Sequence, residues 1–251
     1  MAAGTAALGG KWALVTGAAR RVGATIARSL HESGASVAIH YRESDAPARA
    51  LAAELNASRA GSALITRCDL RQEAAIDSML REVLDHAGRL DILVNNASSF
   101  YPTPIGSITA AQWDDLIGTN LRAPLFLSQA AVPQLRAAHG SIVNLIDIHA
   151  IRPLRDHPVY GAAKAGLAML TRSLARDLAP EVRVNGVAPG AVLWPDDGIE
   201  DRTRESIVRQ IPMRRAGTPE DIAGCVLYLV RDAPYVTGQI ITVDGGRSIG
   251  W

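Results

Sequence analysis

The chain has 251 residues, of which 48% are hydrophobic and 20% are charged, a size that α/β folds often use as a single domain. Its 26 basic and 25 acidic side chains leave a formal net charge of +1, so nothing favours a nucleic-acid or membrane-surface role. No apolar run reaches the ~20 residues of a membrane helix, no secretory signal is apparent, and neither cysteines nor histidines show metal-ligand spacing. We therefore expect a single cytoplasmic domain over 1–251 without a metal site.

Short aliphatic runs alternate with amphipathic stretches along the chain. The runs predict seven strands, at Trp12–Val15, Ser36–Tyr41, Ala63–Thr66, Ile92–Val94, Ser141–Ile146, Val182–Val187 and Gln239–Val243. The stretches predict helices at Arg21–Ser33, Ala46–Ala57, Gln72–Ala87, Ala110–Leu135, Tyr160–Leu178 and Pro219–Val230. This alternation is typical of a Rossmann-type α/β fold, a doubly wound parallel sheet with helices on both faces. Ligands of such sheets bind beyond the carboxyl ends of the strands.

The first predicted strand runs into a glycine-containing loop, residues 16–23, and then into a helix. Gly17 permits a tight turn, and Gly23 lets the helix pack closely on the strand. The free N–H groups at the helix start, around Arg21 and Val22, favour a pyrophosphate. Many structural turns carry two glycines, but the position on the first strand of this pattern predicts a dinucleotide site.

The second predicted strand ends in His40 and Tyr41, followed by Arg42, Glu43 and Ser44. An acidic residue at this strand end usually marks an NAD site, because it binds the ribose 2′-hydroxyl. Here a cation and hydroxyl groups come first, which suits a 2′-phosphate and predicts NADPH as the cofactor. A solvated pair of Arg42 and Glu43 is the alternative.

Later strand ends also carry candidate site residues. Asp69 and Leu70 follow the third strand, where the aspartate either meets the adenine ring or caps the next helix. The longest irregular segments, Ala97–Ser107 and Pro189–Gly198, follow the fourth and sixth strands. Long loops at this edge of a sheet are usually binding loops, so we expect a substrate loop at about 190–217.

One predicted helix begins with a tyrosine and a lysine four residues apart, Tyr160 and Lys164, which places both on one face. A neighbouring ammonium group would stabilise the phenolate that acid catalysis by a tyrosine leaves behind. Such a pair alone is a weak signal. Asp147, at the end of the fifth strand, stands thirteen residues before the tyrosine, and Asn120 lies in the preceding predicted helix.

Several motifs occur together and in order along nearly the whole chain. They are the TGxxxxxG loop at 16–23, Asn95-Asn96-Ala97, Asn120, the YxxxK motif, Pro189-Gly190, VTGQ at 236–239 and VDGG at 243–246. In this combination the chain resembles the short-chain dehydrogenase/reductase superfamily. The resemblance implies that Asn96, Ala97, Pro189 and Gly190 contact the cofactor, and that Lys164 holds the nicotinamide ribose. It further implies a water held by Asn120 and a homotetramer built on the two long helices.

Two positions depart from the usual superfamily pattern. Arg21 stands where a third glycine is usual, and Asp147 stands where a catalytic serine is usual. Together with His40-Tyr41 and the string NASSFYPTP at 96–104, these departures resemble the pteridine reductase branch. That resemblance implies NADPH-dependent reduction of dihydropterins, and sometimes of pterins or folates, with hydride transfer to the pterin C6 or C7.

The chemistry of these residues agrees with a pterin-like small-molecule substrate. Phe100 can stack on a flat heteroaromatic ring opposite the nicotinamide, although it can also be a loop anchor. Ser98 can hydrogen-bond the pterin or the cofactor, and Arg21 can donate to a pterin acceptor and a phosphate at once. Asp147 can bind the polar edge of the pterin, orient Tyr160 or deliver a proton, or be only a turn residue.

Two other functions stay open at this stage. A short-chain reductase of a ketone or 3-oxoacyl thioester is one, but a carboxylate at position 147 would repel the alkoxide that such a reaction forms. A non-catalytic NADPH-binding sensor on the same fold is the other, although the YxxxK pair is intact. Trp194 would shape the substrate pocket or serve as a packing anchor.

Overall fold

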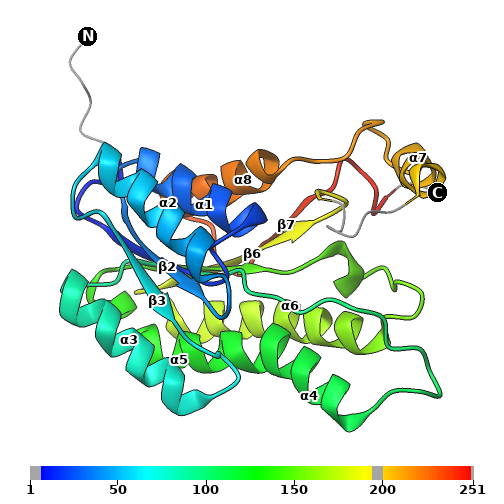
Figure 1. The fold of residues 1–251 in the computed structure, drawn as a ribbon, viewed down its shortest axis with the longest axis horizontal. Helices are drawn as coiled ribbons and strands as arrows, with labels where there is room; N and C mark the ends of the chain where they lie inside the picture. Colours follow the sequence, from blue (N-terminus) through cyan, green and yellow to red (C-terminus); the bar gives the residue numbers. More distant parts are fainter. Residues whose placement is uncertain (1–6, 194–199, 250–251) are drawn as a thin grey trace.

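The computed structural model describes residues 7–193 and 200–249. Their strands form one seven-stranded parallel sheet in the order β3-β2-β1-β4-β5-β6-β7. The strands are β1 (Trp12–Val15), β2 (Ser36–Tyr41), β3 (Ala63–Arg67), β4 (Ile92–Asn95), β5 (Ser141–Leu145), β6 (Arg183–Pro189) and β7 (Ile240–Val243). The predicted Rossmann-type fold is confirmed, because both faces of the sheet are covered by helices (Figure 1).

Helices α1 (Arg21–Glu32), α2 (Asp45–Ser58) and α8 (Pro219–Arg231) cover one face of the sheet (Figure 1). The other face carries α3 (Glu73–Ala87), α4 (Ala110–Ile117), α5 (Ala123–Ala137) and α6 (Pro158–Leu178). Two large aliphatic clusters, one on each side of the sheet, bury the apolar strand residues almost completely. This both-sided burial is why the strands appear in the sequence as continuous apolar runs.

The helix expected over Ala110–Leu135 is not continuous. Five residues, Gly118–Arg122, form a π-helical turn, labelled η1, between α4 and α5. Within this turn the Asn120 Nδ2 atom donates to the carbonyl of Leu116 at 2.9 Å and to that of Ser99 at 2.9 Å. Single π-turns inside helices are frequent at functional sites, and this one directs a buried amide toward the loop after β4.

One helix was missed by sequence reasoning. Helix α7 (Asp201–Arg209) lies inside the segment expected to be a substrate loop and buries none of its residues. It therefore lacks the apolar stripe by which a helix is recognised in a sequence. Among the described residues, no helix is long and apolar enough to cross a membrane, and no group of histidine, cysteine or acidic side chains could hold a metal ion.

Candidate active site

The loop between β1 and α1 is fixed against the end of β4. Gly17 has a φ of +61°, a conformation that glycine tolerates best. A Cβ added to Gly23 would lie 2.4 Å from the Gly17 carbonyl oxygen and 2.5 Å from Asn96 Nδ2, so only glycine fits there. The Asn96 amide donates to the carbonyls of Thr16 at 2.8 Å and of Gly17 at 3.1 Å. The loop is thus preformed, with the start of α1 behind it.

Arg21 occupies the first position of α1 with a φ of +55°. An L-residue in this left-handed region costs roughly 1–2 kcal/mol, which explains why glycine would be the easy choice here. The first turn of α1 carries no acidic side chain, and the side chain of its N-cap residue, Arg20, does not cap the N–H groups of the helix. The helix start therefore favours an anion, and the strained arginine beside it adds a cation.

His40 joins the phosphate loop to β3. Its Nδ1 atom accepts from the Gly17 N–H at 3.1 Å, so its Nε2–H donates to the carbonyl of Cys68 at 3.1 Å. Burial holds the pKa of His40 down at about 4, since a charged ring would lose solvation and could not accept from Gly17. His40 therefore lies at the expected cofactor site, and both ring nitrogens serve to position the loop.

A pH dependence of stability follows from this histidine. The unfolded chain binds a proton at His40 near pH 6.5, whereas the folded chain does so only near pH 4, so acid favours unfolding. Between these two pH values we expect the free energy of unfolding to fall by about 3 kcal/mol through this one group. Urea unfolding across this range checks it, with His40→Asn as the comparison. An equal slope in that variant would contradict the assignment.

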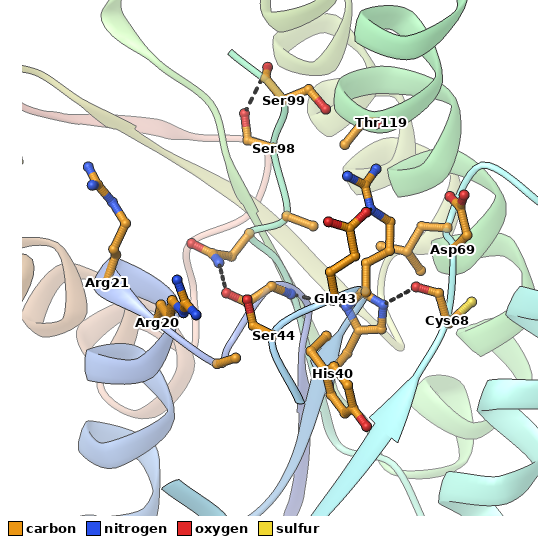
Figure 2. A pocket seen from close by; sticks show the side chains of 18 of the residues that line it. Arg20, Arg21, His40, Glu43, Ser44, Cys68, Asp69, Ser98, Ser99 and Thr119 are labelled. Atoms are coloured by element: carbon orange, nitrogen blue, oxygen red, sulfur yellow. Dashed lines mark hydrogen bonds and ion pairs between the residues drawn. The ribbon is translucent and has the colours of Figure 1, made fainter. Parts of the chain in front are cut away.

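A cavity of about 420 Å³ opens above the carboxyl ends of β1, β2 and β3. In Figure 2, Arg20 and Arg21 approach it from the left, Cys68 and Asp69 lie on the right, and Ser98 and Ser99 lie at the top. Predicted cofactor residues supply most of its lining, namely Gly17, Arg21, Val22, Gly23, His40, Tyr41, Arg42, Ser44, Asp69, Leu70, Asn96, Ala97 and Ser98. The structure thus brings together the segments that follow four separate strands.

Both interpretations of the residues after β2 meet in the structure. Arg42 lines the cavity, and its Nε atom also pairs with a Glu43 carboxylate oxygen at 3.1 Å. Tyr41 is buried and donates its hydroxyl to Asp45. Asp69 binds Arg71 at 2.7 Å, and these hydrogen bonds lower the pKa of the Asp69 carboxyl group to about 2. Asp69 therefore lines the cavity as an ionised carboxylate.

The end of β5 and the start of α6 bring together Asp147, Tyr160 and Lys164. The Tyr160 hydroxyl donates to Asp147 Oδ2 at 2.9 Å, and Oδ1 of the same carboxylate accepts from the His149 N–H at 2.8 Å. Lys164 is 2% exposed, and its Nζ atom donates to the carbonyl of Leu145 at 2.9 Å. The tyrosine and the aspartate thus form one hydrogen-bonded unit.

The electrostatics of this group differ from the sequence-based expectation. Burial, followed by the charge of Asp147, raises the pKa of the Tyr160 phenol far above its ordinary value. Burial lowers the pKa of Lys164 to about 8, and its Nζ atom lies 5.7 Å from the centroid of the Tyr160 ring. Burial and the nearby carboxylate together keep the phenol protonated, so it acts as a hydrogen-bond donor.

Residues from the loop after β4 complete this end of the site. Ser98 Oγ donates to the Asn120 side-chain oxygen at 2.6 Å, which ties the loop to η1. Phe100 is 52% exposed; its ring centroid lies 4.8 Å from that of Tyr160, in an edge-to-face arrangement, and 4.7 Å from that of His157, in a stacked one. The amide of Asn120 is saturated by protein groups. The exposed half of the Phe100 surface can meet a flat ring.

Pro189 and Gly190 lie where β6 ends, at the same carboxyl edge of the sheet as the cavity. Pro189 ends β6 beside Val243, and the Gly190 N–H donates to the Val243 carbonyl at 3.0 Å. A Cβ on Gly190 would lie 2.6 Å from Cβ of Asp244, so glycine is required for this packing. Trp194 lies outside the described residues.

Sequence reasoning missed several residues that the structure places at the site. Arg20 and Arg71 line the cavity, and His157 stacks on Phe100. Their sequence positions could have pointed to two of them, because Arg20 adjoins Arg21 in the phosphate loop and His157 stands three positions before Tyr160. The stacking of His157 on Phe100 could not be predicted, because no spacing rule links His157 to a ring on a distant loop.

Comparisons with known proteins add the following. A family model described as enoyl-(acyl carrier protein) reductase matches residues 17–248. Pteridine reductase 1 from Leishmania tarentolae is 38% identical over 278 residues, covering 94% of this chain and 96% of that protein. The 3-oxoacyl-(acyl-carrier-protein) reductase FabG from Staphylococcus aureus is 39% identical over 240 residues, covering 94% and 97%. The near-equal identities leave the choice of substrate to the site itself.

Proposed function

The chain belongs to the short-chain dehydrogenase/reductase superfamily, and from this premise we propose that it is an NADPH-dependent pteridine reductase acting on dihydropterins. The observation that carries the proposal is the hydrogen bond between the Tyr160 hydroxyl and the carboxylate of Asp147. A carboxylate beside the catalytic phenol suits addition of a proton to a ring nitrogen. It does not suit a reaction that builds negative charge on a carbonyl oxygen.

The cavity fits a nicotinamide dinucleotide in shape and charge. The preformed glycine loop and the uncapped start of α1 suit a pyrophosphate, because its backbone N–H groups are available there. Arg20, Arg42 and Ser44 lie together beside the end of β2, where a 2′-phosphate would replace Glu43 as the partner of Arg42. This arrangement supports NADPH over NADH. The cofactor, when bound, supplies the hydride.

The carboxyl group of Asp147 supplies the proton in this proposal. If Tyr160 alone released its proton, a phenolate would stand 2.9 Å from a carboxylate, and two like charges at that distance strongly oppose each other. Asp147 is half-buried, so solvent, the source of the proton, reaches its carboxyl group. Tyr160 then orients the carboxyl group and the substrate nitrogen, while Lys164 holds the nicotinamide ribose.

Phe100 gives the pocket its preference for a flat ring. The ring stacks on His157 and lies edge-to-face with Tyr160, and about half of its surface is exposed. A pterin lying against this exposed surface would place its polar edge toward Asp147, Ser98 and Arg21. A flexible acyl chain, by contrast, has no flat ring that could stack on the exposed Phe100.

Reduction of a 3-oxoacyl thioester is the second candidate, favoured by the match to FabG at 39% identity. Ketone reductases of the superfamily usually carry a serine at this position, where this chain has Asp147.

We further propose a cytoplasmic homotetramer. Its interface would use α4 and α6, whose Trp113 and Met169 side chains are 49% and 60% exposed, and the two free thiols suit a reducing compartment.

Oxidation of the cofactor against a substrate panel tests the proposal. We expect turnover with 7,8-dihydrobiopterin and 7,8-dihydrofolate, and much weaker turnover with acetoacetyl thioesters. We also expect a higher kcat/KM with NADPH than with NADH, because NADH has no 2′-phosphate to offer to Arg20 and Arg42. Activity on the thioester alone would overturn the assignment of substrate. A preference for NADH would overturn only the assignment of cofactor.

A further inference from the structure

Arg247 lies on a tightly fixed turn that follows β7. Asp244 holds this turn, because its Oδ1 atom accepts from the Gly246 N–H at 2.8 Å and its Oδ2 atom from the Ser248 N–H at 2.6 Å. The turn also packs on the segment after α7, where the Met213 N–H donates to the Gly245 carbonyl at 3.1 Å. In Figure 1 this C-terminal segment and α7 lie at the same end of the sheet. The side chain of Arg247 is therefore presented from a defined position.

That position lies across the sheet edge from the catalytic carboxylate. Strands β5, β6 and β7 are neighbours, so β7 stands roughly 10 Å from β5. The residue between them at this edge is Gly190, which has no side chain to obstruct the space. Burial lowers the pKa of Arg247, and of the carboxylates that oppose this effect Asp147 acts more strongly than Asp244. The guanidinium group is thus within electrostatic reach of Asp147.

The guanidinium group nevertheless has no partner among the described side chains and carbonyl groups. Within residues 7–193 and 200–249 its nitrogen atoms make no hydrogen bond and no ion pair within 4.0 Å, although the side chain is half-buried. Both oxygens of Asp244 are taken by backbone N–H groups, and those of Asp147 by Tyr160 and the His149 N–H. The guanidinium donors are therefore available to an acceptor that binds at this edge of the sheet.

We propose that Arg247 binds an oxyanion, either a carboxylate or a phosphate, carried by the side chain of the pterin substrate. The inference rests on the proposed function. The cofactor cavity lies over β1, β2 and β3, and Phe100 and Asp147 follow β4 and β5. A ring bound between Phe100 and Asp147 therefore directs its substituent away from the cofactor, toward β6 and β7. A guanidinium fork at that end matches the two oxygens of an oxyanion.

Three dihydropterins separate the possible sources of the oxyanion. 7,8-Dihydrofolate carries carboxylates, 7,8-dihydroneopterin 3′-monophosphate carries a phosphate, and 7,8-dihydrobiopterin carries a neutral side chain. In Arg247→Gln we expect kcat/KM for an anionic substrate, relative to the neutral one, to fall about tenfold through KM, because a charge-assisted hydrogen bond is lost. Arg247→Lys should restore part of the loss. The anion with the larger loss identifies the natural group.

Arg231→Gln is the matched control, because it removes one exposed arginine at the C-terminal end of α8, which lies at the opposite edge of the sheet. A ratio that stays constant in Arg247→Gln, or that falls equally in Arg231→Gln, would overturn the inference. If the wild-type protein reduces the neutral pterin but neither anionic one, the inference about Arg247 fails while the proposed function stands. If the wild-type protein reduces none of the three, the proposed function fails, and the inference fails with it.

Discussion

Replacing Asp147 by asparagine is expected to lower kcat for dihydropterin reduction by roughly 10²–10⁴-fold, the usual contribution of a positioned acid or base. The amide has the shape of the carboxylate and can still accept from the His149 N–H, which Asp147 does at 2.8 Å. It cannot carry the transferred proton. Steady-state kinetics together with NADPH titration should therefore show a loss in kcat with little change in cofactor binding.

Two further variants separate chemistry from folding. Asp147→Ala also removes the cap of the short 3₁₀ turn Ile148–Ala150, which costs about 1 kcal/mol of stability. Asp156→Asn is the matched control, because Asp156 is an exposed loop residue at a φ of +59°, a conformation that asparagine tolerates. If Asp147→Asn retains more than a tenth of the wild-type kcat, the carboxyl group is not the proton donor.

Arg21 gives the second large effect: its backbone conformation bears on stability, and its side chain bears on activity. Its φ of +55° favours glycine, so we expect Arg21→Gly to be more stable than Arg21→Ala by about 1 kcal/mol. Both variants lose the guanidinium group that lies beside the cofactor cavity. We expect kcat/KM for the dihydropterin to fall by about 100-fold in both, because contacts to the phosphate and to the pterin are lost.

Urea unfolding measures the stability of these variants, and NADPH oxidation measures their activity. The comparison of glycine with alanine removes the side chain in both cases, so the stability difference reports the backbone conformation alone. Near-wild-type activity in Arg21→Gly would show that the arginine is dispensable. A glycine variant less stable than the alanine variant would contradict the backbone account.

The sheet and the phosphate loop were predictable because their causes are local. Buried parallel strands appear as aliphatic runs, and all seven predicted strands are present, although β6 extends to Pro189. Gly17 and Gly23 could be recognised in the sequence because the loop requires glycine at both positions. Gly17 has a positive φ, and a Cβ on Gly23 would collide with the Gly17 carbonyl oxygen. Helix α7 was missed because it has no buried face.

Several features of the site depend on contacts between distant segments, so the sequence alone could not predict them. The π-helical turn at Asn120 depends on its contact with Ser99, 21 residues away. The raised pKa of Tyr160 depends on its burial and on the contact with Asp147, and residue spacing gives no measure of either. The stacking of Phe100 on His157 likewise requires the fold to bring two loops together.

The most direct test of the account is a competition between the two candidate substrates. 7,8-Dihydrobiopterin and an acetoacetyl thioester are supplied together with NADPH, and the two products are quantified, which gives the ratio of their kcat/KM values in one reaction. Since Asp147 favours protonation of a ring nitrogen over stabilisation of an alkoxide, we predict that tetrahydrobiopterin is the dominant product. Dominant formation of the 3-hydroxyacyl thioester would contradict the account.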